Sequence, residues 1–169
     1  MVFFSGGKGG GEEVSYGYKG KGMTNHLLVD YLGNPLHITT TGADKDEREQ
    51  VCGLLTTMEK PLRQYRLTGK TTILEADKGY DSRICRLSIL AKKIFPFIPY
   101  REMGKGYEEK VGIRYLERKR WQCERAIAWL QRKYRRIVCR WERRIKFWKG
   151  FLNFALVAYW LFKISKFIG

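Results

Sequence analysis

Two acidic residues stand where a carboxylate could take part in chemistry, and the first of them is Asp77. It follows residues 71–76, TTILEA, an apolar and β-branched run that predicts a buried strand. In open α/β sheets, ligands bind beyond the carboxyl ends of strands, where a carboxylate can hold a hard cation. An aspartate in a turn also commonly hydrogen-bonds its own backbone. Position alone favours this turn role over metal ligation.

The second acidic residue, Glu124, lies in the segment RKRWQCERAIAWLQRKYRR. Apolar residues recur there at spacings of three and four, which predicts a helix over 114–141 with a buried stripe at Cys123, Ile127, Leu130, Tyr134, Ile137 and Trp141. Glu124 falls on the flank of that stripe with Arg120 and Gln131, and we expect it to be half-buried. An ion pair with Arg120, four residues earlier, is the simpler explanation. Nothing in the spacing alone connects Glu124 with Asp77.

The same helix is densely basic, which is typical of proteins that bind the phosphate backbone of nucleic acids. The basic residues from position 114 to position 144 are Arg114, Arg118, Lys119, Arg120, Arg125, Arg132, Lys133, Arg135, Arg136, Arg140, Arg143 and Arg144. Trp121, Trp129, Tyr134 and Trp141 are interleaved with them; most should be core, but some could stack on bases. The run GGKGGG at 6–11 lacks the Lys-Ser/Thr end of a nucleotide-binding loop, whereas Lys19 and Lys21 could contact phosphates.

The overall charge supports a polyanionic partner. The 169 residues contain 33 Lys and Arg against 17 Asp and Glu, a net charge of +16, and residues 101–169 hold 19 of the basic residues but 6 of the acidic ones. Four cysteines without a CxxC pair or a histidine cluster argue against zinc and for reduced thiols in the cytosol. The apolar run 151–162 is shorter than the roughly 20 residues of a bilayer span, so a buried helix is favoured.

The elements that must position these residues form a mixed α/β pattern. We expect a glycine-rich loop over 5–22, followed by two strands over 26–32 and 36–41. The Gly-Asn-Pro turn between these strands predicts that they form a hairpin. Asp44 is the expected cap of a helix over 45–59, and Asp81 or Ser82 caps a second helix. A short strand over 94–100 and helices over 114–141 and 145–166 complete the chain. Helices packed on a sheet are therefore expected.

In combination, several motifs resemble the transposases of bacterial insertion sequences, in the five-like group of the DDE superfamily. These motifs are the glycine-rich segment, HLLVD, TTTGADKDEREQV, ADKGYDS and RWQCERAIAWLQRKYRR. The resemblance implies an RNase H-like fold and phosphoryl transfer with two Mg²⁺ ions, or Mn²⁺ in their place, held by three acidic residues. It places the second aspartate at Asp77, the glutamate at Glu124 and a conserved arginine at Arg120. This sequence departs from the family pattern at Gln131, where the family has lysine, and at Glu117, where the family has tyrosine.

The basic residues predict which side chains contact nucleic acid, and the resemblance implies that this nucleic acid is the DNA of the insertion-sequence ends. The expected contacts are Lys19, Lys21, Lys78, Arg120, Arg125, Arg132, Lys133, Arg135 and Arg136. A second copy of the chain, or a transposase segment from an upstream reading frame, is an additional expected partner. The expected location is the bacterial cytoplasm, with nucleoid association when DNA is bound, and no membrane partner is expected.

The largest departure is at the front, where Met1 stands in place of the family's first aspartate. We therefore expect a truncated RNase H-like sheet whose central first strand is largely missing. The expected organisation is a glycine-rich loop over 1–25, a catalytic core over 26–144 and an apolar helix over 145–169 packed on the core. Inner strand edges near 26–32 and 71–76 would then lack partners. Two carboxylates instead of three predict no strand cleavage by the isolated chain.

Three interpretations of function remain. The leading one is the C-terminal portion of a DDE transposase acting in DNA transposition and recombination, either a decayed fragment or the downstream frame of a frameshifted element. The second is a basic DNA-binding remnant that has lost the chemistry. The third, a membrane-surface protein using the helix over 145–166, is less well supported.

Overall fold

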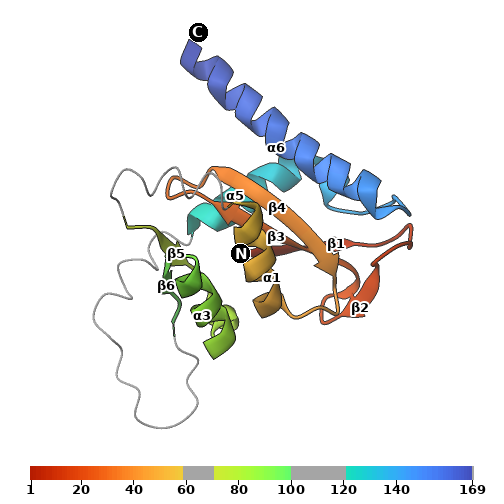
Figure 1. The fold of residues 1–169 in the computed structure, drawn as a ribbon. Coiled ribbons are helices and arrows are strands. Elements are labelled where there is room, and N and C mark those ends of the chain that lie inside the picture. Colours follow the sequence, from red (N-terminus) through yellow and green to blue (C-terminus); the bar gives the residue numbers. More distant parts are fainter. Residues whose placement is uncertain (59–70, 100–120, 169) are drawn as a thin grey trace. The chain divides into compact units, whose positions relative to one another are not determined.

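The computed structural model describes residues 1–58, 71–99 and 121–168 (Figure 1). The chain divides into two compact units, the first formed by Met1–Lys45 with Trp121–Gly169 and the second by Asp46–Arg120. The first unit contains β1 (Val2–Gly6), β2 (Ser15–Gly17), β3 (Gly20–Val29), β4 (Pro35–Gly42), α5 (Trp121–Lys133), the 3₁₀ turn η2 (Arg135–Ile137) and α6 (Ile145–Ile168). The second contains α1 (Glu47–Thr57), β5 (Ile73–Glu75), the 3₁₀ turn η1 (Lys78–Tyr80), α3 (Arg83–Ala91) and β6 (Phe95–Phe97).

The sheet of the first unit is built around β3, the longest strand. β1 pairs with one edge of β3, and β2 and β4 pair with the other edge, all antiparallel. The pairing of Leu27 with Ile38 is part of the β3–β4 register. These two strands, joined by the turn at Gly33, confirm the hairpin expected from the sequence.

Part of the glycine-rich front of the chain is strand, which corrects two expectations. Residues 2–6 form β1, paired with β3 from Val2 opposite His26 to Gly6 opposite Gly22, so a first strand is present. The loop expected over 5–22 is limited to residues 7–14 and the turn at 18–19, because 15–17 and 20–22 are also strand. The physical reason is close packing, because a Cβ on Gly22 would clash with the Ser5 carbonyl and the Phe4 ring. The expected open edge near 26–32 is present in part, because β3 is paired on both sides only as far as Leu27. Among the described residues, Leu28 and Val29 pair with β4 alone.

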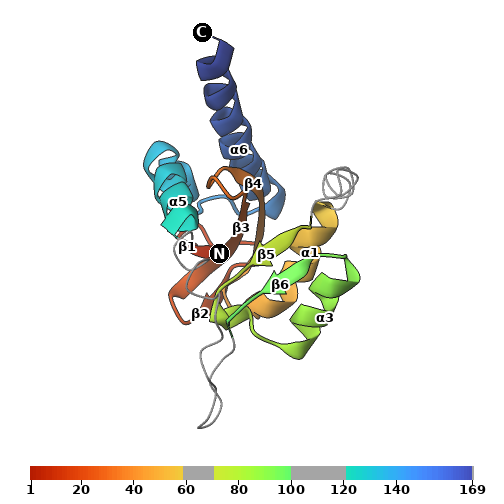
Figure 2. The same cartoon turned by 90° about the vertical axis from the view of Figure 1, so that its left-hand side faces the viewer.

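One face of this sheet carries the core of the first unit. Because side chains alternate along a strand, Phe3, Leu27 and Ile38 share that face, and α5, η2 and α6 pack against it (Figure 2). The buried helical residues are Ala126, Leu130, Ile137, Trp148, Leu152, Ala155 and Leu156. The N-terminal half of α6 is thereby anchored on the sheet, whereas Figure 1 shows its C-terminal half extending past β4.

The second unit holds a two-stranded parallel sheet, β5 with β6, next to α1 and α3. Ser82 caps α3 by accepting a hydrogen bond from the Cys85 amide at 3.1 Å. The cap predicted from the sequence was either Asp81 or Ser82. The cap of α1 is Asp46, which accepts from the Arg48 amide, and not Asp44, whose carboxylate accepts from the Ser15 hydroxyl. β5 is also less buried than expected, with Ile73 54% exposed.

The described residues form the mixed α/β fold predicted from the sequence, consistent with the RNase H-like class. Within the described ranges, no helix combines the length and apolar character needed to cross a bilayer. All four cysteines are free thiols.

Candidate catalytic carboxylates and nucleic-acid surface

Asp77 lies directly beyond β5 and begins the turn η1. Its backbone is extended, and its carboxylate accepts a hydrogen bond from the Lys78 amide at 2.7 Å. The turn interaction proposed as the simpler role is therefore present. It is compatible with metal ligation, because the residue also occupies the carboxyl end of a strand and is only half-buried.

Glu124 lies in the first described turn of α5 and is exposed, not half-buried as expected. The buried residues of α5 are Ala126 and Leu130, and at 100° per residue both lie on the side of the helix away from Glu124. Glu124 belongs to the first unit and Asp77 to the second. Arg120, the third predicted catalytic residue, lies outside the described residues, as do Arg114, Glu117, Arg118 and Lys119.

The helix expected to run to residue 141 ends earlier. α5 ends at Lys133, Tyr134 leaves the helical conformation at φ −116° and ψ 74°, and the chain continues through η2. The predicted buried stripe therefore stops short of Trp141, which is 53% exposed. Ile137 keeps its place in the core because η2 turns it back toward the sheet.

The predicted DNA-binding cations of α5 and η2 fall into two groups. Arg132 and Arg135 are exposed, and neither pairs with a carboxylate among the described residues. The other three have partners within the chain. Arg125 donates to the Leu32 carbonyl at 2.9 Å, Lys133 lies over the Phe162 ring at 4.0 Å, and Arg136 pairs with Glu142 at 2.6 Å.

Arg140 has a structural role instead of the DNA-binding role suggested by its place in the basic run. It is 0% exposed, and its guanidinium donates to the carbonyls of Glu12, Glu142 and Arg143 at 2.7, 2.8 and 3.2 Å. Burial lowers the pKa of Arg140 from its usual value. This side chain fixes the glycine-rich segment against residues 140–143, and no sequence pattern distinguished it from its exposed neighbours.

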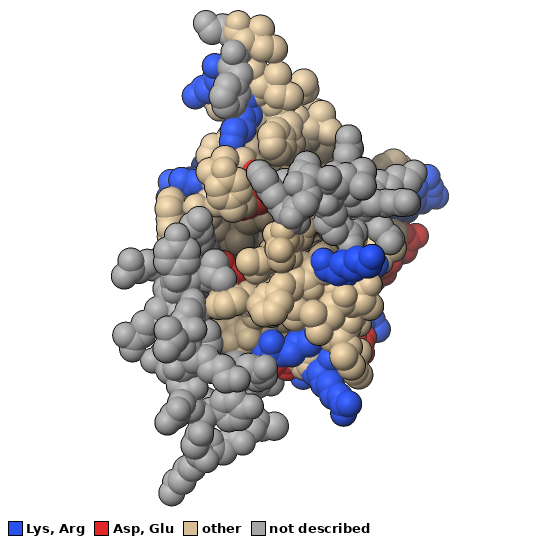
Figure 3. All heavy atoms as spheres, turned by 60° about the vertical axis from the view of Figure 1, so that its left-hand side comes forward, with Lys and Arg blue, Asp and Glu red and all other residues tan. Residues whose placement is uncertain are grey.

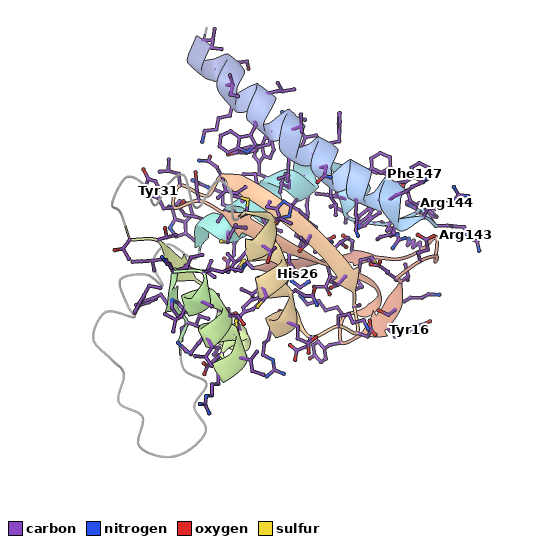
Figure 4. All side chains as sticks on the ribbon, viewed as in Figure 1. Tyr16, His26, Tyr31, Arg143, Arg144 and Phe147 are labelled. Atoms are coloured by element: carbon purple, nitrogen blue, oxygen red, sulfur yellow. The ribbon has the colours of Figure 1, made fainter. Side chains whose placement is uncertain are left out.

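Around Arg140 the structure assembles a basic surface that the sequence did not single out. We name Lys8, Trp141, Arg143 and Arg144, all exposed, the glycine-loop surface. The Lys8 amino group lies 6.0 Å from the centre of the Trp141 ring. Figure 4 shows Arg143 and Arg144 together at the start of α6, pointing away from the sheet. The motif RWERR was the available signal, but helical periodicity had placed Trp141 in the core.

The remaining residues predicted to contact DNA are exposed lysines. Lys19 and Lys21 flank Gly20 at the β2–β3 turn, and the Lys21 amino group lies 5.7 Å from the centre of the Tyr16 ring. Tyr16 and its neighbour Tyr18 are 74% and 105% exposed, so this turn combines cations with aromatic faces. Lys78 is exposed in η1 of the second unit. Cations beside exposed rings suit contacts to nucleic acid.

Comparison with known proteins identifies the family. The family model of the transposase DDE domain matches residues 4–161. The chain belongs to the DDE transposase family. Over 136 residues, the chain is 33% identical to a protein of Burkholderia cepacia described as a candidate transposase for insertion sequence element IS402. The match covers 78% of the chain and 59% of that relative, so the chain spans well under two thirds of its length. No solved structure matches.

Proposed function

We propose that this chain acts in DNA transposition as part of a DDE transposase, with Asp77 and Glu124 as two of the acidic residues at which strands are cut and joined. The single observation that supports this most is the family match over 4–161, which includes both carboxylates. Asp77 at the carboxyl end of β5 and Glu124 on the exposed side of α5 are each accessible to a substrate. DNA is the proposed substrate, and the bacterial cytoplasm the proposed location.

The two carboxylates suit a divalent metal chemically. Oxygen donors of Asp and Glu are the ligands that Mg²⁺ and Mn²⁺ prefer. We propose that Asp77 and Glu124 bind such ions, which would activate the attacking oxygen and stabilise the leaving oxygen of the phosphodiester. Among the described residues, no three His, Cys, Asp or Glu side chains gather at one place.

The residue at the position of the family's first aspartate is Met1, directly before β1. Its carbonyl accepts from the Leu27 amide at 2.8 Å, so it continues the β1–β3 ladder where the family has aspartate. A thioether is a soft ligand and does not replace a carboxylate at Mg²⁺. We therefore propose that this chain by itself binds DNA without cutting it.

Restoring the carboxylate tests the proposed site. We expect the wild-type chain to leave a labelled insertion-sequence end uncut in Mg²⁺. Met1→Asp, made behind an added start methionine, should nick that DNA. The activity should disappear with Asp77→Asn or Glu124→Gln and persist with Glu49→Gln, an exposed glutamate of α1. Nicking by the wild type would refute the proposed inactivity, and nicking that survives Glu124→Gln would refute the site.

A DNA-binding remnant without chemistry is the second candidate, favoured by the exposed cations Arg132 and Arg135 and by the glycine-loop surface. It predicts that Met1→Asp binds DNA as the wild type does and never cuts it. Sequencing the DNA upstream of the coding region distinguishes the two possible origins of the chain, a frameshifted element and a decayed fragment. A slippery run with an in-register Asp-Gly codon pair supports a frameshifted element, and its absence supports a decayed fragment.

A further inference from the structure

The β3–β4 turn, residues 30–34, is fixed by its own hydrogen bonds. The Asp30 carboxylate accepts from the Leu32 amide at 2.9 Å, from the Asn34 amide at 2.8 Å and from the Asn34 side-chain amide at 2.6 Å. The Gly33 amide also donates to the Asp30 carbonyl at 3.0 Å. An aspartate that accepts from backbone amides ahead of it holds such a turn in one conformation.

α6 holds the same turn against the body of the first unit. The Tyr159 hydroxyl donates to the Asn34 side-chain carbonyl at 2.8 Å, and the Lys163 amino group donates to the same oxygen. The Trp160 ring N–H donates to the Pro35 carbonyl at 2.9 Å. Asn34 is 4% exposed, so its hydrogen bonds are largely shielded from water, which strengthens them. The turn is therefore a firm support for any element that packs on it.

The first described turn of α5 contacts this support through Gln122 and Arg125. These residues are three apart, so they lie on one face of the helix. The Arg125 guanidinium donates to the Leu32 carbonyl at 2.9 Å. Gly33 has a φ of +82°, and a Cβ there would lie 3.1 Å from the Gln122 carbonyl. Glycine thus permits the close approach of α5 to the β3–β4 turn.

Arg125 is held by a second contact on its own helix. The central carbon of its guanidinium lies 4.5 Å from the centre of the Trp121 ring, one helical turn earlier. A planar guanidinium can lie over an aromatic ring while one of its five donors binds a carbonyl, an arrangement that a lysine ammonium does not reproduce. The ring and the carbonyl together restrict the orientation of the Arg125 side chain.

We propose that Arg125 is a positioning residue for Glu124. The two are adjacent on α5, so a contact that fastens Arg125 to the β3–β4 turn also fixes the backbone that carries the Glu124 carboxylate. The inference rests on the proposed role of Glu124, and it gives Arg125 a task within the chain in place of the expected DNA contact. DNA attraction does not depend on this one charge, because Lys and Arg reach the surface at several separate places in Figure 3.

The salt dependence of DNA binding separates a positioning role of Arg125 from a phosphate contact. For Arg125→Gln in the otherwise unchanged chain, we expect the slope of log affinity against log salt to equal that of the wild type. Arg83→Gln, at an exposed position of α3, is the matched control and should give the same slope. A slope reduced by about 0.9 in Arg125→Gln alone, the value for one lost phosphate contact, would overturn the proposal.

Amide hydrogen exchange tests the attachment of α5 to the turn. Arg125→Gln should raise the exchange rates of the Leu32 and Asn34 amides and of residues 122–126 by about fivefold or more, while the rates in β1 stay unchanged. Arg83→Gln should leave all of these rates unchanged. If circular dichroism shows that Arg125→Gln unfolds the chain, Arg125→Lys replaces it, because lysine keeps the charge and loses the planar fork. Unchanged exchange in a folded Arg125 variant would overturn the proposal.

Single-turnover nicking by the Met1→Asp chain tests the effect on Glu124. Adding Arg125→Gln should lower the rate constant at saturating DNA by about tenfold or more, because a misplacement of about 1 Å can cost on the order of a hundredfold. The DNA concentration that gives half the maximal rate should not change. An unchanged rate constant, or a change in that concentration alone, would overturn the positioning role. If the Met1→Asp chain does not nick DNA, the proposed site fails, and the salt slope and the exchange rates still decide whether Arg125 fastens α5 to the turn.

Discussion

Two buried polar side chains of the first unit, Arg140 and His26, differ in how the protein accommodates their charge. Arg140 remains paired with backbone carbonyls, which supply acceptors for its donors. The ring of His26, 2% exposed, hydrogen-bonds the Thr41 hydroxyl at 3.0 Å, and burial lowers the pKa of His26 to about 4. The free energy of folding should therefore depend on the identity of Arg140 and on the protonation of His26.

Arg140→Met should lower the free energy of unfolding by at least about 3 kcal/mol, because buried carbonyls that lose their donor cost about 1–3 kcal/mol each. Arg132→Met, at an exposed position of α5, should change it by less than about 0.5 kcal/mol. Urea denaturation monitored by tryptophan fluorescence measures both. Equal losses in the two variants would contradict the structural role of Arg140.

Acidification should destabilise the fold through His26. Its folded pKa of about 4 lies below its usual value of 6.5, so the unfolded chain binds a proton between these values that the folded chain does not. Stability is full above pH 6.5 and falls as the pH drops toward 4, by roughly 3 kcal/mol in all. Urea midpoints at pH 7 and pH 5 measure the loss. His26→Gln should reduce this dependence, whereas His37→Gln should retain the part due to His26.

At the scale of elements, glycine decides how the front of the chain folds. The glycine-rich segment reads as a loop when glycine is taken only as a flexible residue. In the structure, several of its glycines instead allow backbones to approach closely. A Cβ on Gly9 would clash with the Trp141 carbonyl, and one on Gly11, at φ +104°, would clash with the Arg143 carbonyl. The segment is therefore packed against residues 140–143.

Gly9→Ala should destabilise the fold by about 1–3 kcal/mol, because the methyl group has no space beside the Trp141 backbone. Gly53→Ala provides the matched control. Gly53 lies inside α1 with nothing within 4 Å of its would-be methyl group, so alanine should stabilise by about 0.5–1 kcal/mol. Thermal unfolding followed by circular dichroism should thus shift in opposite directions. A rise in melting temperature for Gly9→Ala would refute the close approach.

At the scale of the whole molecule, the charge of +16 is divided between structural and exposed cations. Arg140 stabilises the fold and Arg136 pairs with Glu142, whereas Arg132 and Arg135 remain exposed to a ligand. Affinity for DNA should therefore depend on particular cations more than on the total. The dependence of binding on salt concentration separates these contributions, since each phosphate contact releases counterions.

Arg132→Ala with Arg135→Ala should weaken DNA binding and reduce the slope of log affinity against log salt by roughly 1.8, or about 0.9 for each lost contact. Arg83→Ala with Lys45→Ala removes the same charge from exposed positions outside the predicted DNA contacts and should leave the slope unchanged. Fluorescence anisotropy of labelled DNA at roughly 50 to 300 mM salt measures the affinity and the salt dependence of both double variants. A similar decrease in both variants would mean that net charge alone governs binding.

The sequence by itself determined the local elements and the family. Turn residues and β-branched runs predicted the β3–β4 hairpin, Ser82 was one of two predicted caps of α3, and residues 145–166 were predicted as a helix. These signals act within a few residues along the chain, so they can be recognised without the fold. The motifs around Asp77 and Glu124 predicted the transposase family.

Only the tertiary structure decided the pairing of β1 with β3, the burial of Arg140 and the exposure of one side of α6. Each depends on residues far apart in sequence, as when Arg140 donates to the Glu12 carbonyl 128 positions away. The composition of the glycine-rich segment resembles a loop, and an apolar helix shows no difference between its two sides until one of them is covered. Which backbone lies next to a glycine, and which helix face meets the sheet, is set by packing between distant segments.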